Sequence, residues 1–412
     1  MISTEQLKQI ASTCKTPAFL FDAGEVRSRA GKIKQILNDG IKEGQIGFCY
    51  SIKANPFLIP YLTDCVNAFE VCSPGELSIC KFHQIPAEKI IYSGVNKGMA
   101  DLREAICYSK TAEGSDRPVR LITAESIKHY EMIRRITEET GIAVKVILRL
   151  SSKNQFGMDE SDIEAVLEKN RNCTGIDIVG LHYFAGTQRT KLKHQQQELS
   201  MLTELIDKLR SAYDLPLPIL EYGPGLPFPY FADEERTDTL LPLKELAPDL
   251  QNVQKTCSLT VEMGRFLASS CGYYFTSVVD VKTSFDHRWC ILDGGINHVN
   301  YLGSMMGLKV PVIRVLSDTK DPAPVISQAL CGSLCTTADV LVRSFDAPAL
   351  KEGDILVFEN IGAYSITEGL NLFLSRDMPT VLISGNGQIT AVREALPTWK
   401  LNTTKGTMES NA

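Results

Sequence analysis

Short apolar runs recur along the first two thirds of the chain and alternate with stretches in which apolar residues are spaced three and four positions apart. The helical spacing is clearest at Leu199, Leu202, Leu205, Ile206 and Leu209. The runs that we predict as β-strands are Ile46–Ile52, Phe69–Cys72, Ile90–Ser93, Leu121–Thr123, Val144–Leu150, Ile176–His182, Ile219–Tyr222 and Leu259–Glu262. This alternation is typical of parallel βαβ units, and the number of units favours a closed (β/α)8 TIM barrel over an open doubly wound sheet.

The pattern changes after about residue 265, where apolar runs are joined by Gly, Asp and Pro turns. The runs are FTSVVDVKTS, RWCILDGG, KVPVIRVL, DILVFEN and TVLISGNGQITAVRE, which predict a mostly β C-terminal domain. An early apolar run, Ala18–Phe21, could add a strand to this domain. We therefore predict an α/β protein with a barrel over residues 26–262 and a β-sandwich or β-barrel-like domain over 263–412, joined by the segment 1–25. The polar tail from Asn402 is expected to fray.

The composition of the 412 residues is that of an ordinary globular protein, with 44% hydrophobic and 22% charged residues. The formal net charge of −6 and the lack of a Lys/Arg run argue against nucleic acid as a partner. The first residues are polar and no long apolar run follows, so we expect no signal peptide, no membrane span and a cytoplasmic protein.

The twelve cysteines are scattered through the chain, so we expect reduced thiols rather than a disulfide framework. A metal site is not expected either. The most closely spaced pair, Cys331 and Cys335, lacks CxxC spacing and a neighbouring histidine, and the chain has only six histidines.

Candidate chemistry gathers at the carboxyl ends of the predicted barrel strands, where barrel enzymes place their active sites. The residues at those ends are Lys53, Glu70, Arg149, His182, Phe184, the segment Gly223-Pro224-Gly225, Glu262 and Arg265. Lys53 ends an apolar run that would bury its stem and lower the pKa of its amine, which favours the neutral nucleophile of a Schiff base. A surface lysine is the alternative interpretation, and spacing alone does not decide.

A series of motifs in one order carries a resemblance to a known family. They read PAFLFDAGEV, YSIKANP, FEVCSPGEL, GLHYFAGTQ, EYGPGLPFPYF, VEMGR, DGG, GSLCTTAD and GAY. In this order the chain resembles the fold-type III pyridoxal-phosphate decarboxylases, which include diaminopimelate, ornithine/arginine and carboxynorspermidine decarboxylases. The resemblance implies that pyridoxal 5'-phosphate is bound as a Schiff base on Lys53. It also implies that Glu262 faces the pyridine nitrogen and keeps the ring protonated, so that the ring can act as an electron sink.

The resemblance also assigns the other cofactor contacts. Backbone N–H groups of Gly225 and of the turn Gly264-Arg265 would cradle the phosphate, because glycine lets the main chain approach an anion. This chain has GPG where the family usually has three glycines, so the donor expected here is Gly225. Thr187 and Tyr364 match positions whose hydroxyls reach the phosphate.

Four further positions match residues near the cofactor ring. Glu70 and Arg149 match positions near the ring and the Lys53 amine, and a structural ion pair within the barrel is the alternative for both. Most relatives have a second histidine two residues after His182, whereas this chain has Phe184, which can stack on the ring but cannot exchange a proton. His182 itself could be an inward barrel residue with a satisfied hydrogen bond.

Cys335 is the second catalytic candidate. In the family a cysteine of the GxxCxxxD segment reaches into the partner subunit and protonates the carbanion, and Gly332, Cys335 and Asp339 match that segment here. The resemblance therefore implies a homodimer with shared active sites. A buried structural cysteine is the alternative interpretation.

Substrate choice rests on the residues around Cys335. Diaminopimelate and ornithine decarboxylases have an acid directly after this cysteine, whereas this chain has Thr336, which supplies no charge. Substrate-binding roles are assigned to Thr336 and Asp339, and Arg314 is a possible substitute for an absent arginine that binds the distal carboxylate. The segments QFGMDES, GTQ and LCT resemble a butirosin-pathway branch that acts on a glutamyl group tethered to a carrier protein.

The sequence thus predicts a pyridoxal-dependent carboxy-lyase that removes the α-carboxylate of an amino acid. We expect it to be diaminopimelate decarboxylase-like, with decarboxylation of a carrier-tethered or otherwise modified amino acid of glutamyl type as the alternative. A racemase is less favoured because KANPFLIP lacks the KANAYGHG-like segment. A non-catalytic regulatory homologue is the alternative of another class, although it would be expected to lose Lys53, Glu262 or Cys335.

Overall fold

The computed structural model describes residues 2–108, 117–301, 307–316 and 324–404. They form two compact units. The barrel unit comprises residues 27–228 and 238–267, and the β unit comprises residues 1–26, 229–237 and 268–412. The predicted fraying of the tail falls largely on residues 405–412, which lie outside the described residues.

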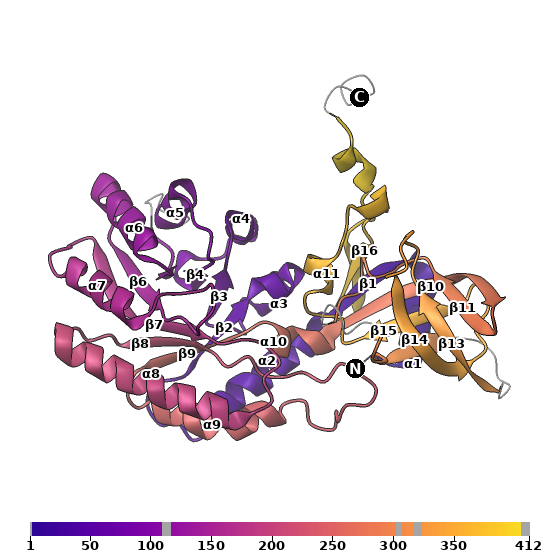
Figure 1. Ribbon diagram of the computed structural model, residues 1–412, viewed down its shortest axis with the longest axis horizontal. Helices are drawn as coiled ribbons and strands as arrows, with labels where there is room; N and C mark the ends of the chain where they lie inside the picture. The colour runs from indigo at the N-terminus through magenta and orange to yellow at the C-terminus, as the bar shows by residue number, and fades with distance from the viewer. Residues whose placement is uncertain (1, 109–116, 302–306, 317–323, 405–412) are drawn as a thin grey trace. The chain divides into compact units, whose positions relative to one another are not determined.

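The barrel unit is built on a closed ring of eight parallel strands in sequence order, drawn from purple to pink in Figure 1. The strands are β2 (Gly47–Ser51), β3 (Ala68–Val71), β4 (Ile90–Tyr92), β5 (Leu121–Ala124), β6 (Val144–Arg149), β7 (Ile176–Phe184), β8 (Ile219–Gly223) and β9 (Ser258–Met263). Parallel pairing of β2 with β9 closes the ring. The predicted barrel is confirmed, because each apolar run became one strand.

Helices follow the barrel strands and pack their apolar sides inward. Their bounds are α2 (Ala23–Asn38), α3 (Ile59–Leu62), α4 (Pro74–Phe82), α5 (Met99–Ile106), α6 (Ile127–Thr140), α7 (Glu160–Asn170), α8 (Leu192–Tyr213), α9 (Leu241–Val253) and α10 (Arg265–Ala268). The helix predicted from the Leu199–Leu209 spacing is confirmed, since all five of its periodic apolar residues are buried in α8. Short 3-10 turns, η1 (Ile52–Ala54), η2 (Pro56–Leu58) and η3 (Ala87–Lys89), complete the unit.

An apolar plug fills the interior of the barrel. It consists of Cys49, Ala68, Ile91, Leu121, Ile147 and Val179, with Ile219 packed against it. These residues lie early in their strands, so the polar side chains that come later in the same strands stand at the carboxyl end of the ring. The plug thereby restricts the candidate chemistry to one end of the barrel.

The β unit contains a nine-stranded sheet with the order β14-β13-β11-β10-β1-β16-β17, in which β15 pairs with β10 and β12. The strands are β1 (Ala18–Asp22), β10 (Gly272–Ser284), β11 (His287–Leu292), β12 (Ile313–Leu316), β13 (Val325–Cys331), β14 (Val340–Pro348), β15 (Ile355–Glu359), β16 (Thr380–Gly385) and β17 (Gln388–Arg393). The early apolar run forms β1 between β10 and β16, as the sequence predicted. Shorter elements are α1 (Thr4–Thr13), α11 (Ser365–Glu368), η4 (Ser269–Cys271), η6 (Phe373–Ser375) and η7 (Thr398–Asn402).

One segment clusters differently from the predicted boundary. Residues 229–237 fall inside the range predicted for the barrel but belong to the β unit. The Tyr230 hydroxyl and the Ser269 hydroxyl are 2.6 Å apart, and the Ala232 amide donates to the Val310 carbonyl at 2.8 Å. These bonds tie the segment to residues of the β unit that follow it by many positions, which local patterning does not reveal.

No helix in the described part of the chain is both long and apolar enough to cross a membrane.

Candidate active site

Lys53 and Glu70 form an ion pair at the carboxyl end of the barrel. Lys53 lies in η1 directly after β2, and Glu70 lies in β3, opposite Ser51 in the strand register. The Lys53 Nζ donates to Glu70 Oε2 at 2.7 Å, with the lysine side chain 41% exposed and the glutamate side chain 3% exposed. Burial alone would raise the pKa of Glu70, but the charge and hydrogen bond of Lys53 outweigh it and lower that pKa to about 2. The carboxylate is therefore ionised and stabilises the charged form of the Lys53 amine.

A buried carboxylate and a buried imidazole face each other across the same end of the barrel. Glu262 from β9 and His182 from β7 approach to 3.3 Å between Oε2 and Nε2, and their side chains are 6% and 1% exposed. The His182 Nδ1 is buried and has no hydrogen-bond partner among the described residues. His182 is thus an inward barrel residue with a hydrogen bond, as one of its two interpretations expected, and its partner is Glu262.

Gly223 at the end of β8 packs closely against two predicted cofactor residues. A Cβ atom at this position would lie 2.3 Å from Glu262 Oε1 and 2.5 Å from Phe184 Cδ2. Both distances are far below van der Waals contact, so only glycine fits between the carboxylate and the ring. The arrangement brings Glu262 and Phe184 to one place and leaves it free of any side chain from β8.

Three predicted phosphate contacts meet at a second place in the barrel unit. The Arg265 Nε donates to the Thr187 Oγ1 at 3.3 Å. Gly225 has a φ of +60°, and a Cβ there would lie 1.8 Å from the Gly186 carbonyl oxygen. The loops after β7 and β8 are therefore packed backbone against backbone, and the Arg265 side chain joins the loop after β9 to them.

Arg149 pairs with a residue that the sequence analysis did not select. The guanidinium lies 3.1 Å from Glu125 Oε1, and the two side chains are 9% and 2% exposed. It also lies 4.9 Å from the centre of the Phe156 ring. Glu125 follows β5, so the pair joins neighbouring strand ends. Its signal in the sequence is an acid at a strand end, the same signal that selected Glu70.

Two more buried ionisable groups were missed. Lys97 is 4% exposed, and burial lowers the pKa of its amine to about 8. Glu221 in β8 is fully buried, and neither of its carboxylate oxygens has a hydrogen-bond partner in the described structure. Glu221 precedes Gly223 by two residues and shares its face of the strand, so the period of two could have identified it as an inward acid.

The remaining predicted residues lie in the β unit, where the turn between β13 and β14 carries three of them. Cys335 and Thr336 are exposed. Asp339 is 3% exposed, and its carboxylate accepts hydrogen bonds from the Ile296 and Leu334 amides at 2.8 and 2.7 Å. Asp339 therefore holds the shape of the turn, while Cys335 and Thr336 are accessible at its surface.

Arg314 and Tyr364 complete the set. Arg314 in β12 forms an ion pair with Glu359 and donates to the Ile2 carbonyl at 2.8 Å. Both contacts of its guanidinium lie within the β unit, and we do not retain Arg314 as a substrate ligand. Tyr364 is half-buried and precedes α11 with a φ of +68°.

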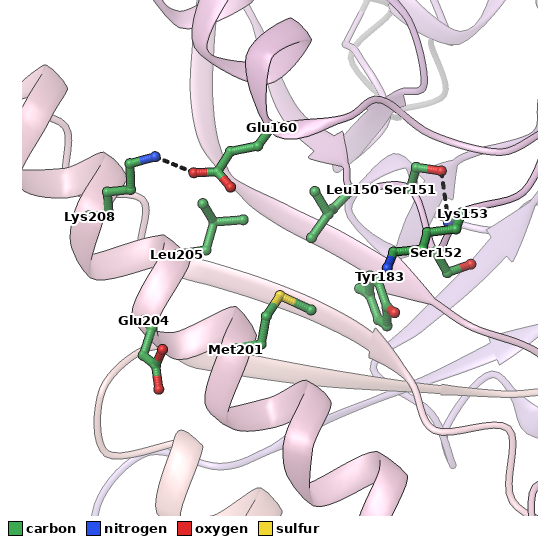
Figure 2. A pocket seen from close by; sticks show the side chains of 10 residues that line it. All are labelled: Leu150, Ser151, Ser152, Lys153, Glu160, Tyr183, Met201, Glu204, Leu205 and Lys208. Carbon is green, nitrogen blue, oxygen red and sulfur yellow. Dashed lines mark hydrogen bonds and ion pairs between the residues drawn. The ribbon is translucent and has the colours of Figure 1, made fainter.

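A separate cleft of about 550 Å³ lies on the outer side of the barrel, between the segment that follows β6 and helix α8 (Figure 2). Leu150, Met201 and Leu205 supply apolar surface, and Lys208 pairs with Glu160 across it. None of the predicted site residues lines this cleft, so it is distinct from the site described above.

Comparison with known proteins gives consistent matches over nearly the whole chain. Residues 23–269 match the family described as "Pyridoxal-dependent decarboxylase, pyridoxal binding domain". The chain is 25% identical to the L-glutamyl-[BtrI acyl-carrier protein] decarboxylase of Niallia circulans, covering 94% of this chain and 93% of the relative. It is 23% identical to the diaminopimelate decarboxylase of Aquifex aeolicus, covering 94% and 91%.

Solved structures share the fold. The diaminopimelate decarboxylase from Helicobacter pylori complexed with L-lysine superposes with a TM-score of 0.82 at 20% identity, covering 96% of this chain and 99% of that chain. This likeness supports the barrel and the mostly β second unit as one known architecture.

Proposed function

Because the chain belongs to the pyridoxal-dependent decarboxylase family, we propose that Lys53, Glu262 and the loops after β7, β8 and β9 hold pyridoxal phosphate for the α-decarboxylation of an amino acid. The chain is a pyridoxal-dependent amino-acid decarboxylase, a carboxy-lyase. The observation that carries the proposed cofactor site is the convergence of the Glu262 carboxylate and the Phe184 ring at Gly223, where no side chain of β8 fits.

The residues present fit this cofactor. Phe184 offers a ring for stacking, and the Glu262 carboxyl group offers an acceptor for a protonated pyridine nitrogen. When bound, the pyridinium ring supplies an electron sink for the pair that remains after carbon dioxide departs. His182, at 3.3 Å from Glu262, keeps that carboxylate oriented from inside the barrel.

Lys53 would hold the cofactor and move protons at its Nζ. The ionised Glu70 at 2.7 Å keeps the free amine charged and positioned whenever Lys53 is released. Its low pKa makes this carboxylate a poor proton acceptor, so its role is electrostatic. Glu70 is therefore proposed to position Lys53 Nζ through the ion pair.

Cys335 is proposed as the acid that protonates the product carbon. Its thiol stands on an exposed turn whose shape Asp339 fixes through two amide hydrogen bonds. We propose that the chain acts as a homodimer in which the turn completes the partner subunit's site. Phe184 cannot take the proton-donor role, because its ring has no exchangeable proton.

The substrate is proposed to be an amino acid whose far end carries no free charge, such as an acyl group tethered to a carrier protein. The turn over residues 332–339 has no exposed charged side chain, since Asp339 is buried and Thr336 bears only a hydroxyl. A buried or shielded charge without a partner costs several kcal/mol, on the order of 3–5. Free diaminopimelate is the second candidate, supported by the several diaminopimelate decarboxylases among the relatives.

Carbon dioxide release by pyridoxal-phosphate-loaded protein tests the activity. The panel contains meso-diaminopimelate, ornithine, lysine, arginine, glutamate, and glutamate as the thioester of an acyl-carrier protein. Turnover of the thioester with little turnover of the free acids is the expected result. Preferred turnover of diaminopimelate would select the second candidate. Lys53→Ala should abolish turnover, and appreciable turnover in that variant would contradict the proposed role of Lys53.

A further inference from the structure

The β unit contains a cavity of about 850 Å³ on the part of the sheet formed by β11, β13 and β14. We name it the sheet cavity and define it by Trp289, Ala329, Leu334, Thr336 and Arg343, which are among its lining residues. Its volume is within the range of roughly 300–1,000 Å³ typical of sites for ligands much larger than a free amino acid. A free amino acid would therefore leave most of the cavity empty.

The floor of the sheet cavity is apolar. Trp289 in β11 and Ala329 in β13 are direct partners in the strand register, and both line the cavity. Ile291 and Cys331, two positions further along the same strands, line it as well, as the two-residue period of strands requires. Trp289 is half-buried, so part of its ring remains available for contact with a ligand.

Two exposed basic side chains lie at or near the sheet cavity. Arg343 lines it. Lys282 is not among the lining residues, but it lies opposite Trp289 in the register of β10 and β11 and therefore shares the face of that residue. Neither side chain forms an ion pair within the described part of the chain. Two acids line the sheet cavity. The buried Asp339 carboxylate accepts hydrogen bonds from two backbone amides, whereas Asp286 is exposed.

The lining of the sheet cavity includes the two sequence neighbours of the proposed catalytic cysteine. Leu334 and Thr336 line it, whereas Cys335 itself is an exposed residue of the same turn and is not among the lining residues. A ligand that fills the cavity therefore contacts the turn that carries Cys335 and can contact basic side chains elsewhere along its length. That order of contacts suits a long molecule with a reacting group at one end and an anionic group farther away.

We propose that the sheet cavity binds the 4′-phosphopantetheine arm through which a carrier protein presents the acyl substrate. The arm has a phosphodiester for Arg343 and Lys282, a branched apolar segment for Trp289, and two amides for hydroxyl groups such as that of Thr336. Its thioester end lies next to Cys335. This inference rests on the proposed function, and it adds the site that recognises the tether.

Tryptophan fluorescence tests the binding without turnover. The chain has two tryptophans, so Trp399→Phe leaves Trp289 as the reporter. Holoenzyme carrying this substitution is titrated with 4′-phosphopantetheine and, separately, with pantetheine, which lacks the phosphate. We expect a saturable change in emission with the phosphorylated probe. Binding should weaken roughly tenfold in Arg343→Ala and when the phosphate is removed, the loss expected for one charge-assisted hydrogen bond.

A matched control addresses a second cleft that has basic residues. Lys153 lines the cleft of Figure 2 and is exposed, so Lys153→Ala removes a cation there. Its affinity for the probe should equal that of the parent. Weaker binding in Lys153→Ala, unchanged affinity in Arg343→Ala, or no emission change at millimolar probe would each overturn the proposal.

Two further readouts separate the possible failures. Sedimentation of Arg343→Ala tests whether the face that contains the sheet cavity joins two copies of the chain. If this variant dissociates and neither it nor the parent binds the probe, the face is a contact between copies and the proposal is overturned. Carbon dioxide release from the glutamyl thioester of an acyl-carrier protein reports the decarboxylase itself. If that release persists while no variant or parent binds the probe, the tether site fails and the decarboxylase assignment stands.

Discussion

Glu221 introduces a carboxyl group into the interior of the barrel without a hydrogen-bond partner among the described residues. Burial raises the pKa of this group well above its usual range, and the carboxylates of Glu262 and Glu70 raise it further. Arg120 and Lys53 act in the opposite direction but do not reverse the shift. The thiol of Cys49 is buried near the same carboxylates and remains neutral, because its pKa is raised as well. Glu221 is therefore a neutral acid in the folded protein.

This state predicts a pH dependence of stability. The pKa of Glu221 is higher in the folded chain than in the unfolded chain, where a glutamate titrates near about 4.3. The folded state thus holds an extra proton above that pH, and stability contributed by Glu221 is lost as pH rises toward its folded pKa. Glu221→Gln removes this loss. We expect the variant to gain more than about 1 kcal/mol relative to the parent between pH 5 and pH 8.

Urea unfolding at several pH values measures the effect. Glu43→Gln, at an exposed position of the same unit, is the control and should follow the parent at every pH. A parallel pH profile for Glu221→Gln and the parent would show that Glu221 is ionised in the folded protein.

Thr336 sets a second prediction at the residue scale. A carboxylate at this exposed position would meet the distal ammonium of diaminopimelate, because the turn offers it no competing cation among its own residues. Thr336→Glu should raise kcat/KM for diaminopimelate roughly tenfold, through one charge-assisted hydrogen bond. Thr337→Glu places the same charge one residue away and should raise it less. Unchanged kinetics in Thr336→Glu would mean that the distal group is bound elsewhere.

At the scale of elements, the strands that could be predicted are those that the local pattern of apolar residues determines. Each barrel strand is an apolar run, so the eight strands could be found from sequence. Strands β13 and β14 were missed, because polar residues such as Ser327, Gln328 and Arg343 interrupt their apolar residues on a half-exposed sheet. The partner of Arg149 was missed for another reason, since Glu125 follows β5 and meets Arg149 of β6 only through the pairing of these two strands.

The end of β8 gives a prediction at this scale. Gly223→Ala would force Glu262 or Phe184 to move, because the new Cβ would lie 2.3 and 2.5 Å from their atoms. Both are proposed cofactor contacts, so the affinity for pyridoxal phosphate should fall at least about tenfold, with about 1–3 kcal/mol lost from stability by overpacking. Absorbance titration with the cofactor and urea unfolding measure the two effects.

Gly31→Ala is the matched control for this substitution. Gly31 lies within α2, and nothing stands within 4 Å of the position that its Cβ would occupy. Cofactor affinity should be unchanged, and stability should rise by about 0.5–1 kcal/mol, as for alanine replacing glycine in a helix. Equal cofactor affinity in Gly223→Ala and the parent would contradict the proposed position of the ring.

At the scale of the whole molecule, the proposed reaction divides its groups between the two units. Lys53, Glu70 and Glu262 belong to the barrel unit, whereas Cys335 and Tyr364 belong to the β unit. The barrel unit alone contains the groups proposed to hold the cofactor ring, so cofactor binding and product protonation are separable functions. Substitutions in the two units should therefore cause different defects. Lys53→Ala removes attachment of the cofactor, and Cys335→Ala leaves the cofactor bound but slows protonation by on the order of 10²–10⁴.

These separable defects test whether the active site is shared between two copies of the chain. If Cys335 serves the partner subunit's barrel, co-expression of Lys53→Ala with Cys335→Ala yields heterodimers in which one site has both intact residues and the other has neither. With random pairing, half of the dimers are heterodimers and each has one intact site of two, so activity should recover to about one quarter of the parent. Carbon dioxide release by the unselected mixture of co-expressed chains measures the recovery. If Cys335 instead serves its own barrel, every site in the mixture lacks one residue, and activity stays at the level of the single variants.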